Sequence, residues 1–435
     1  MRQPGYCTYF TSMRDSYLLW SGKTNQNLFG ISVLIFDMSE SSGYKDFVWA
    51  VKLNRMNLNM IGIWPTTNKD TMKIFGPDIR VAFTFIVITF GTLIPLICGL
   101  TRIWGDLILM VDNVRITLPI IVISAKLVIM RWKQKGTFII NHKRDGEDWI
   151  ASKVAAERDV MIRQARIAQI FVMFGYFILA MVSVTLIILP TFGIQMRHIT
   201  NLTDRNKPLP MQTYYFYDTD RSPQFELTFL IQAITVVQSA IIYTSIDSLL
   251  GLVILHMCGQ LENFKRRIAG LVSSKDFNKA LSSSVVTHLR LIRYAKNIES
   301  VFTLVLFLLI LQFAVVFCLC GFLLLIVLTE NESINYSEIS FMAIVFVSLL
   351  IQAFCYCFGA DLITEKCDAV YRTICDLEWY TLEARKARNL ILLTLLAKQP
   401  FRITAGKVVP LNMSTFVSLL KTSAGYISFF IAMRN

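Results

Sequence analysis

Residues 301–328, VFTLVLFLLILQFAVVFCLCGFLLLIVL, decide the fold class, because they form an apolar run without a charged side chain. About 20 consecutive apolar residues are enough for a helix to cross the hydrocarbon core of a bilayer. Hydrophobic residues make up 54% of the 435-residue chain, and the mean hydropathy is +0.52. The chain is therefore predicted to be an all-α integral membrane protein that is surrounded by a lipid bilayer.

Seven segments are predicted to cross the membrane as helices within one continuous domain, residues 81–435. Their ranges are 81–100, 114–130, 167–190, 227–255, 301–328, 339–358 and 411–433. The second contains Arg115 and Lys126 and the last contains Lys421, so these two are the least uniformly apolar. Before the first span, residues 44–80 are predicted to form an amphipathic helix at the inner leaflet. Residues 1–43 form a tail for which no structure is predicted.

The basic residues predict the orientation of these spans. Most of the 43 Lys and Arg residues lie in segments that alternate along the chain: 1–80, 131–166, 256–300 and 361–409. Because an excess of Lys and Arg marks the cytoplasmic side, the N-terminus is predicted to be cytoplasmic and the C-terminus extracellular. This topology is inverted relative to G-protein-coupled receptors. The net charge of +13 is attributed to topology, and no nucleic-acid partner is expected.

The loops assigned to the outside contain glycosylation sequons at Asn201, Asn331 and Asn335, which are predicted acceptor sites. None of the nine cysteines falls in these loops, so no disulfide framework is expected. The histidines have no metal-ligand spacing, and neither H-E-x-x-H, G-x-S-x-G nor a phosphate-binding glycine loop occurs. We therefore expect neither an enzyme, a metal site nor a cofactor.

Two cytoplasmic segments, 282–300 and 361–400, are predicted to continue as helices from the adjoining spans. The second is about 40 residues long, which is too long for an inert loop. Its apolar residues recur at helical spacing, and the run NLILLTLLA (389–397) is too short to span a bilayer. Both helices are therefore predicted to form assembly surfaces between subunits.

The last span has a polar stripe along one side. Within an arc of about 120° lie Ser414, Ser418, Lys421, Gly425, Phe429 and Met433. From the inner to the outer end this stripe is polar, then small, then bulky and apolar, which suits a helix that lines a water-filled pore with a hydrophobic gate. The sequence predicts Ser418, Lys421, Gly425, Phe429 and Met433 as pore and gate residues. Lys421 either faces the pore, or it pairs with a neighbouring helix or snorkels to the membrane surface, and both interpretations stay open.

Several separated motifs resemble one known family. TAGKVVPLNMSTFVSLLKTSAGYISFF (404–430) resembles the C-terminal signature of insect odorant receptors. FVWAVKLNRMNLNMIGIWP (47–65) resembles their N-terminal helix, IDSLLGLVILHMCGQLENF (246–264) their fourth span, and LEWYTLEARKARNLILLTLLAKQPFRITAGK (377–407) the helix before the last span. The motifs occur in the family's order, and together they look like the tuning subunits of ants, bees and wasps.

The resemblance implies a function. The chain would be a subunit of an odorant-gated, non-selective cation channel that acts with a shared co-receptor as a heterotetramer. It would lie in the plasma membrane of olfactory sensory neuron dendrites. The last helix of each subunit would line the pore, with Phe429 and Met433 at the gate positions of the family.

The resemblance also implies a site for a volatile organic odorant between the second, third, fourth and sixth spans, in the outer half of the membrane. Depth and helix assignment select as candidates Val114, Leu118, Tyr176, Met181, Thr185, Phe229, Ala233, Val237, Phe341, Val345 and Leu349. A pocket of this kind recognises shape, with Tyr176 or Thr185 as a polar handle. Each candidate is alternatively a residue of helix–helix packing.

Two alternatives remain. Insect gustatory receptors share the inverted topology, but the Thr, Gln and Phe of their last-helix motif are missing at 425–433. A G-protein-coupled receptor would need an external N-terminus and usually an external disulfide. Asp247, on the inner part of the fourth span, is by default a candidate functional residue, because ionisable residues inside a membrane are costly. The family resemblance instead implies a structural role, such as pairing with Lys126.

Overall fold

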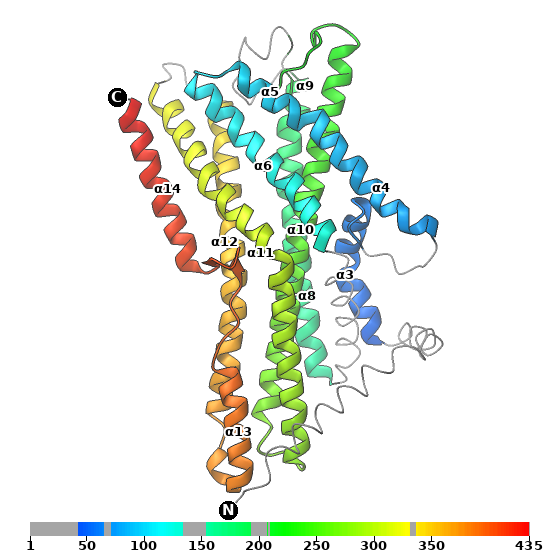
Figure 1. Ribbon diagram of the computed structural model, residues 1–435, viewed down its shortest axis with the longest axis vertical. Coiled ribbons are helices and arrows are strands. Elements are labelled where there is room, and N and C mark those ends of the chain that lie inside the picture. Colours follow the sequence, from blue (N-terminus) through cyan, green and yellow to red (C-terminus); the bar gives the residue numbers. More distant parts are fainter. Residues whose placement is uncertain are drawn as a thin grey trace, which may run out of the picture.

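The computed structural model describes residues 42–64, 71–133, 154–192, 207, 209–330 and 336–434. Figure 1 shows an elongated bundle of helices that lie side by side along its long axis. The elements are α3 (Ser42–Met60), α4 (Thr71–Ile88), η1 (Thr89–Leu93), α5 (Ile94–Arg102), α6 (Leu107–Lys133), α8 (Ala155–Ser183), η3 (Val184–Ile188), α9 (Leu189–Thr191), α10 (Gln224–Ala269), α11 (Phe277–Glu330), α12 (Tyr336–Cys375), η4 (Trp379–Thr381), α13 (Ala384–Ala397), β1 (Thr404–Ala405), β2 (Val409–Pro410) and α14 (Met413–Arg434).

Six helices of the described chain are long and apolar enough to cross a membrane. They are Pro77–Arg102, Leu107–Lys133, Ala155–Thr191, Gln224–Ala269, Phe277–Ile326 and Ile339–Thr381. Five of them contain a predicted span in full, and the fifth helix covers the predicted span 301–328 up to Ile326. The predicted seventh span corresponds to α14, a helix of 22 residues that is not among these six. α11 has 54 residues, about 80 Å of helix, whereas a bilayer core is about 30 Å thick. Only part of it can lie in the membrane, and residues 277–300 precede the predicted span.

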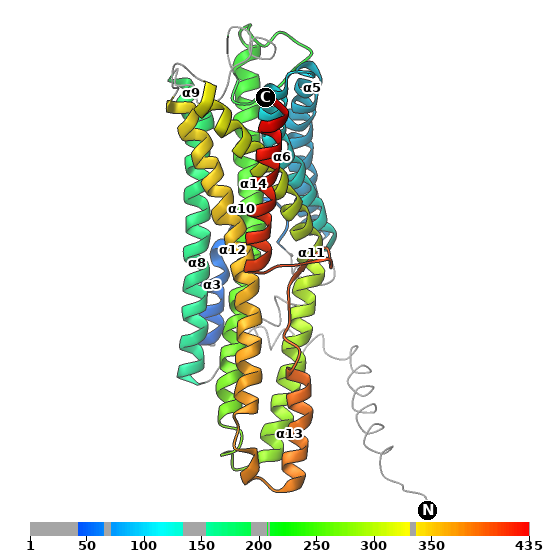
Figure 2. The same cartoon turned by 90° about the vertical axis from the view of Figure 1, so that its left-hand side faces the viewer.

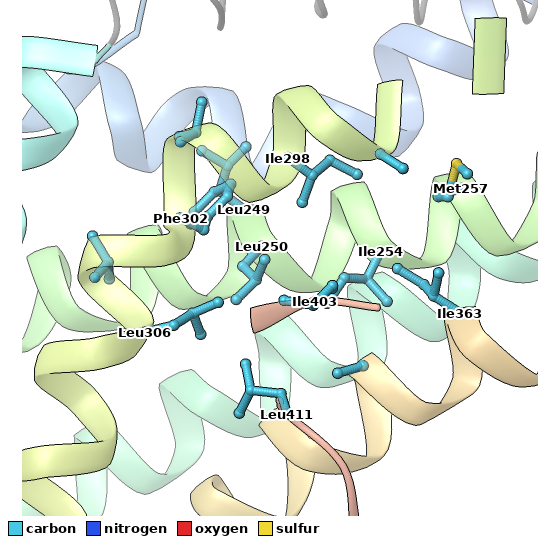
Figure 3. Close-up of a cluster of buried hydrophobic side chains, with 14 of the residues drawn as sticks. Leu249, Leu250, Ile254, Met257, Ile298, Phe302, Leu306, Ile363, Ile403 and Leu411 are labelled. Atoms are coloured by element: carbon cyan, nitrogen blue, oxygen red, sulfur yellow. The ribbon is translucent and has the colours of Figure 1, made fainter. Parts of the chain in front are cut away.

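α10 and α11 form the centre of the bundle. α10 packs against α8, α12, α3 and α6, and α11 packs against α6, α12 and α14 (Figure 2). Figure 3 shows how apolar side chains from several elements converge at the middle of the molecule. The labelled residues there are Leu249, Leu250, Ile254, Met257, Ile298, Phe302, Leu306, Ile363, Ile403 and Leu411, all of them buried. Burial of this apolar surface holds the long helices together.

The segment at 361–400 differs from its prediction as one helix. α12 ends at Cys375, residues 376–383 turn through η4, and α13 runs back beside α12 and α11 (Figure 1). This reversal buries Leu390, Leu393 and Ala397, which a straight extension of α12 would leave in water. Packing of these residues therefore outweighs the local tendency to continue the helix.

The amphipathic helix predicted at 44–80 is likewise interrupted. α3 ends at Met60, and α4 begins at Thr71. Between them Gly62 has a φ of +76°, and a Cβ built there would lie 2.5 Å from the carbonyl oxygen of Pro77. Glycine thus permits both the left-handed turn and the close approach of α4. Residues 65–70 lie outside the described part of the chain, as do residues 1–41 of the predicted tail 1–43; Ser42 and Gly43 already belong to α3.

A short hairpin connects α13 to the last helix. β1 and β2 pair antiparallel, and the turn between them packs on α11, where the Gly406 amide donates to the Thr303 carbonyl at 2.9 Å. The start of α14 is fixed from two sides. The Asp361 carboxylate of α12 accepts the Met413 amide at 2.8 Å, and the Asn412 side chain accepts the Thr415 amide at 2.7 Å.

Candidate ion pathway and ligand site

One side of α14 is packed against the rest of the chain. Phe416, Leu419 and Leu420 contact the main core, and the Phe416 ring meets Phe354 of α12 edge-on at 5.9 Å. Ile427 lies over Gly321 of α11, where an added Cβ would come within 2.3 Å of it. The covered side of the last helix is thus the apolar side, as its periodicity predicts.

The opposite side of α14 is largely exposed. Ser414, Ser418, Lys421, Gly425 and Phe429 are all exposed, and the Phe429 side chain is 57% exposed. No described atom lies within 4 Å of a Cβ built on Gly425. Met433 lies on the final turn of the same helix. The stripe predicted from the sequence is therefore the surface that α14 presents to lipid, to water or to another chain.

Lys421 has no counter-charge on the helices that pack against α14. Within the membrane-depth segments of these neighbours, 301–328 of α11 and 339–360 of α12, the sequence contains no Asp, Glu, Lys or Arg. A lysine at bilayer depth is costly unless water or a partner solvates its ammonium group. The interpretation that it pairs with a helix of its own chain thus loses its simplest partners. Water in a pore, a neighbouring subunit and snorkelling to the membrane surface stay open.

The predicted ligand residues lie on four helices, three of which pack against α10. Val114 and Leu118 of α6, Tyr176 of α8, Phe229 and Ala233 of α10, and Val345 and Leu349 of α12 are half-buried. Phe341 of α12 is buried, and its ring lies 5.6 Å from the Arg115 guanidinium of α6. These contacts bring the outer parts of α6 and α12 together.

Two of the candidates face away from the bundle, because Met181 is 42% exposed and Val237 is 41% exposed. Of the two polar handles, Thr185 is buried, and its hydroxyl donates to the Met181 carbonyl at 2.7 Å within its own helix. The Tyr176 hydroxyl is buried beside Ser245 of α10 and makes no well-formed hydrogen bond to the described residues. Tyr176 is therefore the candidate whose donor is available to a ligand.

A cluster of polar side chains lies among the buried residues of α6, α10 and α12. Lys126, which is 0% exposed, places its ammonium 2.7 Å from Asp247 Oδ1 and 3.7 Å from the Tyr243 ring centroid. The Gln352 amide donates to Asp247 Oδ2 at 3.1 Å and accepts from the Tyr243 hydroxyl at 2.7 Å. We call Lys126, Tyr243, Asp247 and Gln352 the central polar cluster. The predicted pairing of Asp247 with Lys126 is confirmed, whereas Gln352 and Tyr243 were not anticipated.

The sequence interpretation also missed polar contacts near the outer end. Arg115, treated above only as an interruption of its span, forms a buried ion pair with Asp112 at 2.5 Å. Their spacing of three residues along a helix was a usable signal. Gln232 of α10 is also buried; it accepts the Met211 amide at 3.0 Å and donates to the Thr213 hydroxyl at 2.7 Å. It thereby attaches the segment that precedes α10 to that helix, and no pattern in the sequence indicated this.

A small apolar cavity of about 20 Å³ lies between α11, α12 and α14. Its lining includes Phe313 of α11, Tyr356 of α12, and Thr415, Phe416 and Leu419 of α14. A volume of this size has room for about one water molecule. The cavity is therefore too small for an odorant, but it leaves unfilled space next to the last helix.

The predicted glycosylation sites at Asn201, Asn331 and Asn335 lie outside the described residues. Among the residues that are described, no group of three His, Cys, Asp or Glu side chains is placed to hold a metal ion.

Comparison with known protein families decides what this helical membrane protein is. The family model described as 7tm Odorant receptor matches residues 106–424. The chain belongs to the insect odorant receptor family. Membership agrees with a multi-pass membrane receptor and counts against an enzyme.

Individual relatives are distant and match in part. Odorant receptor 10 of Aedes albopictus is 28% identical over 216 residues, which cover 48% of this chain and 56% of that protein. Odorant receptor 13a of Drosophila melanogaster is 27% identical over 250 residues, which cover 53% of this chain and 58% of that protein. The chain thus matches little more than half the length of these two receptors.

Solved structures extend the likeness of fold over most of the chain. The insect olfactory receptor OR5 from Machilis hrabei superposes with a TM-score of 0.71, covering 89% of this chain and 98% of that one at 14% identity. The same receptor in complex with eugenol superposes with a TM-score of 0.69, covering 89% of this chain. At this identity the comparison establishes the fold alone, and it agrees with the predicted all-α membrane architecture.

Proposed function

We propose that this odorant receptor is an odour-tuned subunit of a ligand-gated, non-selective cation channel. The single observation that carries the proposal is the uncovered polar stripe of α14, which contains Lys421 and is not matched by any charge on α11 or α12 at membrane depth. Such a face is unsuited to lipid and is suited to a water-filled pathway. α14 then lines the pore, with Ser418, Lys421 and Gly425 along its wall.

The proposed gate is formed by Phe429 and Met433 near the external end of α14. Phe429 is exposed on the stripe, so in an assembly around a central axis its ring can narrow the pathway. Bulky apolar side chains close a pore by making it unfavourable for water and ions. Opening requires movement of this part of α14 away from the axis.

The proposed ligand is a volatile organic odorant held between α6, α8, α10 and α12, in the outer half of the membrane. Apolar side chains dominate the candidates, and Tyr176 offers the available hydroxyl. Binding can open the channel only if the odorant has a higher affinity for the open state than for the closed state. Eugenol in the complex of the Machilis hrabei receptor is a ligand of that protein, and it is a natural first probe here.

The proposed assembly is a heterotetramer with a shared odorant co-receptor. The cytoplasmic helices supply a surface for it, because α13 leaves Ile391, Leu392 and Leu395 more than half exposed at 56%, 63% and 61%. An apolar face of this kind in water indicates a contact with another chain. The orientation with a cytoplasmic N-terminus follows from the distribution of basic residues. The location in sensory dendrites, the hymenopteran lineage and the occupancy of the three sequons belong to the same proposal.

The proposal is tested by recording currents from cells that express this chain, the co-receptor, or both, while a panel of volatiles that includes eugenol is applied. We expect an odour-evoked cation current only when both chains are present, and we expect it to persist when G-protein signalling is blocked. Current from this chain alone would instead mean that it forms its own pore without the co-receptor. A response that disappears under G-protein block would contradict the channel.

A further inference from the structure

The central polar cluster has more hydrogen-bonding groups within reach than it uses. The Tyr243 hydroxyl donates to the Gln352 amide oxygen of α12, but the Gln312 amide of α11 lies beside the same hydroxyl. Gln312 is 2% exposed, and its Oε1 has no hydrogen-bond partner among the described residues. A buried acceptor atom without a hydrogen bond is costly, so Gln312 Oε1 gains from any donor that comes within reach. The Tyr243 hydroxyl therefore has one occupied and one vacant acceptor, on two different helices.

A second unused group lies on α12, one helical turn after Gln352. The Tyr356 hydroxyl is buried without a hydrogen bond to any described residue, and it lies beside Asp247. Asp247 already accepts hydrogen bonds from Lys126 and Gln352. A small shift of α12 along α10 can thus replace the Gln352 contact by one from Tyr356. In these exchanges the Tyr243 hydroxyl keeps an acceptor and the Tyr356 hydroxyl gains one, while the Gln352 amide gives up its two partners. Each arrangement therefore leaves some polar groups of the cluster unpaired, and neither satisfies all of them.

The position of the cluster connects the ligand helices to the last helix. In sequence, Leu349 of the candidate ligand site precedes Gln352 by three residues on α12. On the other side, Tyr356 and Phe416 of α14 line the same small cavity, and Phe354 of α12 packs on Phe416. A displacement of α12 at the cluster therefore has room to proceed and acts directly on α14. Coupling between two sites requires such an element with two discrete arrangements.

We propose that the central polar cluster is a two-position hydrogen-bond switch that couples the ligand helices to α14. In one position the Tyr243 hydroxyl binds Gln352 and holds α12 against α10, and in the other it binds Gln312 of α11 and releases α12. Lys126 and Asp247 stay paired in both positions and serve as the fixed point. Tyr243, Gln312 and Gln352 are positioning residues that touch neither odorant nor ions. The inference rests on the proposed channel function.

The test compares Gln312→Met with Gln352→Met in the full chain, co-expressed with the co-receptor. Each variant removes one of the two acceptors, so each biases the switch toward the other position. We expect the half-maximal concentration of the most active volatile of the panel to shift in opposite directions, each by roughly two- to ten-fold for one buried hydrogen bond. The current without odorant should shift correspondingly, rising in one variant and falling in the other.

Two controls separate a switch from a merely structural role. Gln260→Met removes an amide of α10 whose Nε2 is buried without a hydrogen bond and that lies outside the cluster, and it should leave the half-maximal concentration unchanged. In a Tyr243→Phe background, Gln312→Met should lose its effect, because the hydroxyl that both acceptors share is gone. Shifts of the two Gln variants in the same direction, or an effect of Gln312→Met that persists without the Tyr243 hydroxyl, would overturn the switch while leaving the channel intact.

A readout without current keeps the inference independent of channel activity. In purified protein, hydrogen–deuterium exchange of the α12 amides around Gln352 should increase in Gln352→Met and decrease in Gln312→Met. Equal exchange in both variants would exclude the switch. Failure of the unmodified chain to conduct with the co-receptor would bear on the proposed function instead.

Discussion

Lys126 and Lys421 are two lysines at membrane depth that the fold treats in opposite ways. Lys126 is fully buried, and its ammonium lies 2.7 Å from Asp247 over the ring of Tyr243. Lys421 is exposed on α14, and its packing neighbours carry no charge at that depth. For Lys126, the Asp247 carboxylate of the same chain compensates the desolvation of the ammonium group. For Lys421, water or a group of another molecule must solvate the ammonium, which is why the exposed lysine points to function.

The largest effect is expected from leaving Lys126 without its partner. Asp247→Leu would strand an ammonium group in the core and should lower the free energy of unfolding by about 3–5 kcal/mol. Thermal unfolding of purified protein and surface expression measure this. The matched control is the Lys126→Met, Asp247→Leu double variant, which removes both charges and should recover most of the loss. A double variant as unstable as the single one would mean that the pair is not what holds α6 to α10.

The next comparison uses two phenylalanines on opposite sides of α14. Phe416→Ala should destabilise the protein by about 2–3 kcal/mol, because the ring is half-buried against Phe354 and the core. Phe429→Ala, on the exposed stripe, should change unfolding by less than about 0.5 kcal/mol. The same substitution should raise the current without odorant if Phe429 closes the pore. Equal losses of stability at the two positions would contradict the assignment of covered and uncovered faces.

The two lysines also show which features of the structure can be predicted from the sequence and which cannot. The first six membrane-length helices, the exposed stripe on α14 and the pairing of Lys126 with Asp247 were predictable, because charges and long apolar runs obey strong rules in a membrane. Gln352 and Tyr243 were not, since an uncharged polar residue inside an apolar run has no periodicity of its own. The break between α12 and α13 was missed for a related reason. Residues 361–399 contain neither Gly nor Pro, so only the burial of Leu390 and Leu393 determines the turn.

His288 is a buried base for which no ion pair with a carboxylate is found among the described residues, and it sharpens the comparison. It lies on α11 before the predicted span, stacked on Phe264 of α10 at 5.4 Å. Burial lowers the pKa of His288 below its usual value of 6.5, so the folded protein keeps the ring neutral. The unfolded chain takes up a proton as the pH falls below about 6.5, and the folded chain does so only at lower pH. Stability should therefore decrease with acidification, by at most about 1.4 kcal/mol per pH unit.

Thermal unfolding of purified protein between pH 7.5 and 5.5 measures this dependence. His288→Gln removes the titrating ring, so the variant should lose less stability over this interval than the unmodified chain. Identical pH dependence in both proteins would show that other groups control the response. Unlike Lys126, this base can avoid the cost of burial by giving up its proton, which is why it needs no ion pair.

The smallest expected effect comes from Lys421 itself, and it decides what solvates the exposed lysine. If its ammonium faces the pore at about 10 Å from a passing ion in water, the repulsion changes the permeability of Ca²⁺ relative to Na⁺ by about two-fold, because a divalent ion carries twice the charge. Lys421→Gln should raise that ratio by this factor, and Lys421→Arg should preserve it.

The matched control is Lys398→Gln, which removes an exposed lysine at the cytoplasmic end. Reversal potentials report the ratio independently of expression, because they do not depend on how many channels open. An unchanged ratio in Lys421→Gln would mean that this lysine does not face the pore. It would then lie against a neighbouring subunit, and that second chain would bury and pair its ammonium group as Asp247 does for Lys126 within one chain.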